Sequence, residues 1–151
     1  MVKMSKTLII GYGNTLRRDD GIGQILAQDI AELYWPNCQT LSVHQLTPEL
    51  AAAITAVERV IFIDAYIADA ASNPPLRIEK VAATEPTAGF GHRSDPGELL
   101  ALTQILYNKT VLAWQVLIPA IDITLGETLS PPTEQARTTA LAAIWRLVQV
   151  S

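Results

Sequence analysis

Two aspartates and one histidine stand where an α/β protein could assemble a site for a divalent metal ion. Asp20 precedes an expected helix, Asp64 follows the apolar run 60–63, and His92 follows Gly91 in an expected loop. Active sites of open α/β sheets lie at the carboxyl ends of the strands. Two carboxylates that face one cleft repel each other, and a cation relieves that repulsion. Two oxygen ligands and one imidazole suit a borderline ion such as nickel or zinc, with coordination positions left open.

Each of these residues also has a plain structural explanation. Asp19 and Asp20 stand before a helix, where a carboxylate can accept hydrogen bonds from free N–H groups. The two roles can coexist, because one oxygen can cap the helix while the other faces a metal. Asp64 could instead accept hydrogen bonds from loop amides at the end of its strand. A lone loop histidine is usually a surface residue, so His92 counts only in combination with the two carboxylates.

The glycine turn at Gly11 and Gly13 raises a second possibility, a nucleotide-binding module. The third glycine of the G-x-G-x-x-G pattern would fall at Leu16, and His44 stands where an acidic residue should close the second strand. The loop from strand to helix is also longer than the usual length of about 2–6 residues, which is typical of a working loop. No G-x-S-x-G, H-E-x-x-H or C-x-x-C motif occurs.

The elements that must position these residues alternate between β-like and helical patterns, which is typical of a sheet covered by helices. The run 60–63 is continuously apolar, as expected of a central strand buried on both faces. No crossover helix precedes 76–81, so this strand is expected to pair antiparallel. Expected strands cover residues 7–10, 38–43, 60–63, 76–81 and 110–118, and expected helices cover residues 21–34, 47–57, 95–107 and 130–148. We predict one α/β domain over residues 1–151, a three-layer sandwich with a mostly parallel, twisted sheet of about five strands and helices on both faces.

The composition suits one compact globular domain. Of the 151 residues, 49% are hydrophobic and 17% are charged, which argues against disorder. The net charge of −4 does not favour binding to nucleic acid or anionic lipid, which are themselves negatively charged. No stretch approaches the roughly 20 apolar residues of a membrane helix. Cys38 is the only cysteine, so we expect a cytoplasmic protein without a disulfide. We also expect a monomer with neither nucleic-acid nor membrane partners.

Three segments of the chain resemble nickel–iron hydrogenase maturation endopeptidases. The sequence IIGYGNTL at 9–16, followed by DDGIG at 19–23, is similar to the opening signature of that family. VIFIDA at 60–65 resembles its third strand with the terminal aspartate. GH at 91–92, before LLAL at 99–102, resembles its histidine segment. The resemblance covers nearly the whole chain and keeps the order of the elements.

This resemblance implies an endopeptidase that removes the C-terminal extension of the hydrogenase large-subunit precursor after nickel insertion. It places the catalytic and metal-binding positions on Asp20, Asp64 and His92, which would recognise nickel supplied by the precursor. The chain departs from the family at 44–50, HQLTPEL, where many members carry a Gly-Gly-Thr-type segment associated with substrate recognition. Which hydrogenase is processed therefore stays open. A non-catalytic nickel-sensing chaperone that docks on the large subunit stays an alternative.

Overall fold

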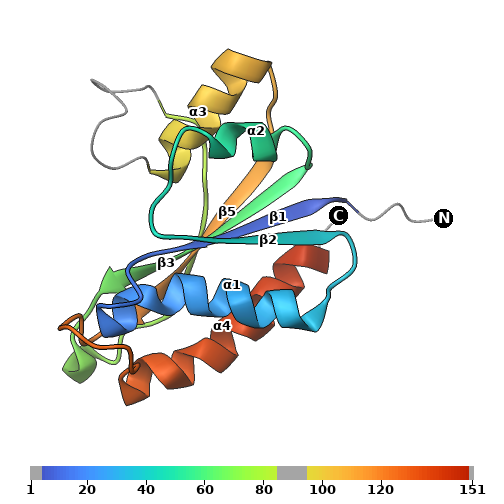
Figure 1. Ribbon diagram of the computed structural model, residues 1–151. Coiled ribbons are helices and arrows are strands. Elements are labelled where there is room, and N and C mark those ends of the chain that lie inside the picture. The colour runs from blue at the N-terminus through green and yellow to red at the C-terminus, as the bar shows by residue number, and fades with distance from the viewer. Residues whose placement is uncertain (1–4, 85–94, 150–151) are drawn as a thin grey trace.

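A five-stranded β-sheet organises the part of the chain that the computed structural model describes, residues 5–84 and 95–149. The strand order is β2-β1-β3-β5-β4 (Figure 1). The strands are β1 (Thr7–Tyr12), β2 (Cys38–Val43), β3 (Arg59–Ile67), β4 (Arg77–Lys80) and β5 (Leu112–Ala120). β4 pairs antiparallel with β5, whereas all other neighbouring strands run parallel. The mostly parallel sheet and its antiparallel fourth strand are therefore confirmed.

Helices cover both faces of this sheet, as predicted. The helices α1 (Ile22–Leu33) and α4 (Pro131–Gln149) lie on one face, and α2 (Leu50–Ile54) and α3 (Pro96–Tyr107) lie on the other (Figure 1). Two short 3-10 helices, η1 (Arg18–Gly21) and η2 (Ala70–Ser72), precede α1 and follow β3. The chain thus forms the predicted three-layer α/β sandwich. Of the helices in the described ranges, none combines the length and hydrophobicity that crossing a membrane requires.

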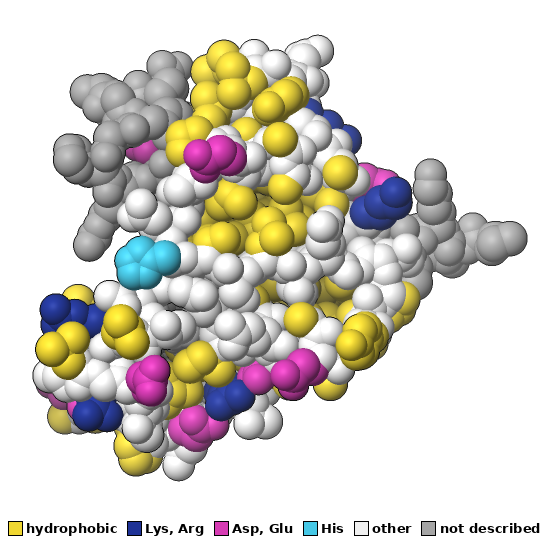
Figure 2. Space-filling model, in the orientation of Figure 1, with side chains coloured by type: hydrophobic (Ala, Val, Ile, Leu, Met, Phe, Trp, Pro, Cys, Tyr) yellow, Lys and Arg dark blue, Asp and Glu magenta, His cyan; other side chains and the backbone are white. Residues whose placement is uncertain are grey.

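Alternate residues of the central strands fill one apolar layer on each face of the sheet, because successive strand side chains point in opposite directions. Leu8, Ile10, Val60 and Phe62 pack toward α2 and α3, and Ile9, Ile61, Ile63 and Val116 pack toward α1 and α4. Two covered faces explain the continuous apolar run in β3. With five residues, α2 leaves Leu41, Val43 and Leu50 only partly buried. Figure 2 shows hydrophobic side chains gathered in the hollow beside α2.

Predicted and observed boundaries differ at several elements, most clearly at the end of β3 and the start of the second helix. β3 does not end at Asp64 but continues to Ile67, because β5 extends beside it and pairs Ala120 with Ile67. The second helix does not open at Thr47. The Thr47 carbonyl accepts a hydrogen bond from the Leu50 amide in a turn, and α2 begins only at Leu50. In both cases a pairing partner or a local turn overrides the signal that the sequence carries at the boundary.

Candidate functional site

β1 ends beside the second half of β3 at one edge of the sheet, here called the carboxyl edge. Gly11 pairs with Ile63, so Tyr12 and Asp64, the next residues on these strands, are neighbours at this edge. Adjacent placement of the first and third strands is therefore confirmed. Asp64 lies two residues after Phe62 and shares its face of the sheet, the one that α2 and α3 cover.

Asp64 belongs to a short polar array with Tyr12 and Gln115. Gln115 Nε2 donates a hydrogen bond of 3.0 Å to the Tyr12 hydroxyl, which in turn is hydrogen-bonded to the half-buried carboxyl group of Asp64. Burial, and then the negative charge of Asp64, raises the pKa of Tyr12 above its usual value, so the hydroxyl keeps its proton. Asp64 Oδ1 also accepts a 2.7 Å hydrogen bond from the Ala65 amide. These contacts orient the carboxylate, and the sequence analysis missed both Tyr12 and Gln115.

Asp20 stands in η1, between β1 and α1. Its Oδ2 accepts a hydrogen bond of 2.9 Å from the Asn14 amide. The surrounding backbone is tight, because a Cβ atom at Gly13, where φ is +141°, would lie 2.0 Å from the Asp20 carbonyl oxygen. Gln24 Nε2 donates to the Gly13 carbonyl at 2.6 Å. The N-cap of α1 is Gly21, without a side-chain hydrogen bond, so the helix-capping interpretation of Asp20 is wrong.

Asp19 is the buried member of the acidic pair, with 0% of its surface exposed. Its Oδ2 accepts hydrogen bonds from the amides of Ile121 and Asp122 at 2.8 and 2.9 Å and from Ser130 Oγ at 2.6 Å. Its Oδ1 accepts a 2.7 Å hydrogen bond from the Ser130 amide. Burial alone would raise the pKa of the Asp19 carboxyl, but these hydrogen bonds hold the pKa below its usual value. Asp19 therefore connects η1 to a distant segment and does not cap α1.

The convergence of Asp20, Asp64 and His92 stays a prediction, because His92 lies outside the described residues. η1 contacts β3, so Asp20 and Asp64 belong to neighbouring elements at the carboxyl edge. Within the described ranges, which omit His92, no three His, Cys, Asp or Glu side chains group closely enough to hold a metal ion. His44 is solvent-exposed after β2, and its carbonyl accepts a hydrogen bond of 3.2 Å from the Gly13 amide.

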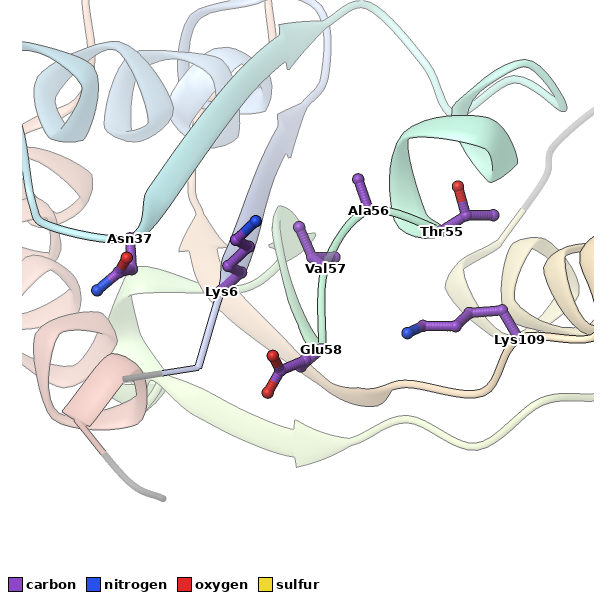
Figure 3. A pocket seen from close by; sticks show the side chains of 7 residues that line it. All are labelled: Lys6, Asn37, Thr55, Ala56, Val57, Glu58 and Lys109. Carbon is purple, nitrogen blue, oxygen red and sulfur yellow. The ribbon is translucent and has the colours of Figure 1, made fainter. Parts of the chain in front are cut away.

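A pocket of about 450 Å³ opens at the opposite, amino-terminal edge of the sheet. Its lining consists of Lys6, Asn37, Thr55, Ala56, Val57, Glu58 and Lys109 (Figure 3). Lys6 and Glu58 directly precede β1 and β3, whereas Asp20 lies in η1, after β1, and Asp64 lies in the second half of β3. This pocket is therefore separate from the candidate site.

No protein-family model matches the chain, and no curated protein sequence does. Several solved structures do match in fold. The NiFe hydrogenase maturation protease HybD from Thermococcus kodakarensis is 24% identical, with a TM-score of 0.73 over 95% of this chain and 99% of that chain. The hydrogenase maturating endopeptidase HybD from E. coli is 16% identical, with a TM-score of 0.74 over 95% and 92%. HycI, a NiFe hydrogenase maturation protease from Thermococcus kodakarensis KOD1, is 17% identical, with a TM-score of 0.70 over 96% and 93%. The chain thus has the fold of these proteases along nearly its whole length.

Proposed function

We propose that the protein is a hydrogenase maturation endopeptidase that removes the C-terminal extension of a nickel-loaded large-subunit precursor. One observation carries the proposal. Asp20 and Asp64, two of the three positions that the family resemblance assigns, lie on neighbouring elements at the carboxyl edge, where open α/β sheets build active sites. The similarity in fold to three maturation proteases, over at least 95% of this chain, supports it.

In this proposal Asp20, Asp64 and His92 recognise the nickel ion, which belongs to the substrate. Two carboxylates and an imidazole suit such an ion and leave coordination positions open for the ligands of the precursor. A bound divalent ion can lower the pKa of a water molecule that attacks a peptide bond. The chain's own contribution is orientation: the Asn14 amide holds Asp20, and the Tyr12 hydroxyl holds Asp64.

The Tyr12 hydroxyl gives a direct test of this orientation. Tyr12→Phe removes the hydroxyl that is bonded to Asp64 and leaves the ring in place. We expect precursor processing to fall by about 10-fold, because outer partners that orient metal ligands typically contribute that much. Tyr66→Phe is the matched control, since the Tyr66 hydroxyl donates to the Pro75 carbonyl and not to the candidate site. Processing is measured by mass spectrometry of the precursor. If the two variants process it equally fast, Tyr12 has no role in the mechanism.

The nucleotide-binding alternative meets an electrostatic objection at the Gly13 turn. A Cβ atom at Gly13 would lie 2.0 Å from the Asp20 carbonyl oxygen and 3.9 Å from its Oδ2. The carbonyl oxygen carries a partial negative charge and the carboxylate a full one. Both therefore repel a phosphate at the turn where a nucleotide-binding fold would hold the phosphate. Tight binding of an adenine nucleotide to the purified protein, measured by calorimetry, would revive this alternative.

The decisive experiment separates a protease from a chaperone that only docks. The protein is mixed with nickel-loaded and with nickel-free large-subunit precursor, and the precursor mass is followed over time. We expect the nickel-loaded precursor alone to lose its C-terminal peptide, because the proposed recognition acts through nickel. A stable complex without shortening would support the chaperone instead.

The proposal also covers the setting of the reaction. We place it in the cytoplasm, where Cys38, the single cysteine, would stay reduced. Its thiol is half-buried, and burial raises its pKa, so it is a poor nucleophile. The large-subunit precursor is the expected partner of a monomeric enzyme. The net charge of −4 does not favour nucleic acid or anionic lipid as a further partner.

A further inference from the structure

The buried carboxylate of Asp19 joins two segments at the carboxyl edge of the sheet. One is η1, which also carries Asp20, and the other is the segment 121–130 between β5 and α4. This segment donates four hydrogen bonds to the Asp19 carboxylate. An ionised carboxylate offers about four lone-pair sites, two on each oxygen, and here three of the hydrogen bonds reach Oδ2 and one reaches Oδ1. Asp19 is fully buried and both of its oxygens accept hydrogen bonds, so its contribution acts on the position of its neighbours.

The two segments are also connected along their backbones. The Arg18 amide donates to the Gly126 carbonyl and the Gly126 amide donates to the Leu16 carbonyl, each at 2.9 Å. The Asp19 amide donates to the Asp122 carbonyl at 3.0 Å. The ion pair of Arg18 with Asp122, at 3.8 Å, is partly exposed and therefore contributes little. The buried, charge-assisted hydrogen bonds of Asp19 are the strongest link between the segments.

Asp20 follows Asp19 in the same 3-10 turn, so the two carboxylates point in different directions. One residue corresponds to a rotation of about 120° in such a helix. Asp19 reaches the segment 121–130, whereas Asp20 accepts its hydrogen bond from the Asn14 amide. A fixed Asp19 therefore fixes the backbone from which Asp20 projects. Metal ligands act best when surrounding groups hold them in place in advance.

We propose that Asp19 is a positioning residue: its carboxylate holds η1 against the segment 121–130 and so sets Asp20 toward the nickel ion of the substrate. The role of Asp20 rests on the proposed function, but the attachment of η1 can be measured independently of it. The amide hydrogen of Asn14 donates to the Asp20 carboxylate and so reports whether Asp20 keeps its place.

The test compares the wild-type protein with Asp19→Asn, which keeps the size of the side chain but turns an NH₂ group toward N–H donors. We expect faster hydrogen exchange of the Asn14 amide by NMR, with unchanged protection of the amides in β1 and β3. We also expect the affinity for Co²⁺, followed by its absorption spectrum, to fall by about 10- to 100-fold. Asp122→Asn is the matched control, because Asp122 is hydrogen-bonded to Asp19 through its backbone and its partly exposed ion pair with Arg18 contributes little. It should leave the Asn14 exchange and the Co²⁺ affinity unchanged.

A folded Asp19→Asn protein with wild-type Asn14 exchange and wild-type Co²⁺ affinity would overturn the proposal. If this variant does not fold, Ser130→Ala replaces it, because it removes one of the four hydrogen bonds. The same two changes are then expected at smaller size, and their absence counts against the proposal. If the wild-type protein binds no Co²⁺ and leaves the precursor uncut, the proposed function fails. Faster Asn14 exchange in Asp19→Asn would still support the attachment of η1.

Discussion

Replacing Asp64 with asparagine is expected to lower processing of the nickel-loaded precursor by about 100-fold or more, the usual effect of removing a charged group from a catalytic centre. Asparagine keeps the size of the side chain and an oxygen that can accept the hydrogen bond of the Ala65 amide. The fold should therefore persist while the negative charge that we propose attracts the nickel ion is lost. Asp20→Asn and His92→Ala are expected to have effects of the same size.

The measurement combines precursor mass over time with a thermal unfolding curve for each variant. Asp69→Asn is the matched control: Asp69 is exposed and caps η2 by accepting a 3.0 Å hydrogen bond from the Ala71 amide. Asparagine caps a helix about as well as aspartate, so this variant should process at the wild-type rate. Wild-type processing by all three site variants would reject the assignment of the site, whatever the fold of the chain.

The elements that could be predicted from the sequence are those whose determinants lie close together along the chain. β2 occupies the predicted residues 38–43. The start of α3 is also confirmed, because Asp95 Oδ1 accepts a 2.8 Å hydrogen bond from the Glu98 amide, three residues later. The end of β3 could not be found in this way. It depends on the pairing of Ile67 with Ala120, which no local pattern contains.

The same limit explains what the sequence analysis missed at the candidate site. It identified an acidic pair but could not tell the buried member from the open one. The partners of Asp19 lie 102 to 111 residues further along the chain, so only the fold separates it from Asp20. Tyr12 and Gln115 are 103 residues apart and meet only because β1 and β5 both lie beside β3. A useful sequence signal for Tyr12 was its place between Gly11 and Gly13, directly after the first predicted strand.

Gly23 is a position in α1 where one added methyl group should cost considerable stability. A Cβ atom there would lie 2.4 Å from the Ile63 carbonyl oxygen and 2.5 Å from the Tyr12 carbonyl oxygen. Both are backbone atoms of central strands and cannot turn aside as a flexible side chain would. In the G-x-G-x-x-G pattern the third glycine allows helix and strand to pack closely. Here Gly23 allows this close packing, whereas the third position of the pattern is Leu16. Gly23→Ala is expected to lower the free energy of unfolding by about 3 kcal/mol.

The sign of this effect separates close packing from helix propensity. By propensity alone, Gly23→Ala would stabilise α1 by up to about 1 kcal/mol, because alanine is the better helix former. Ala31→Gly, at an exposed position of the same helix, isolates that term and should destabilise by about 1 kcal/mol. Urea unfolding of both variants makes the comparison, and a Gly23→Ala protein as stable as the wild type would disprove the packing argument. Where Gly23→Ala still folds, precursor processing should also fall, since displacing α1 moves the adjoining η1 and with it Asp20.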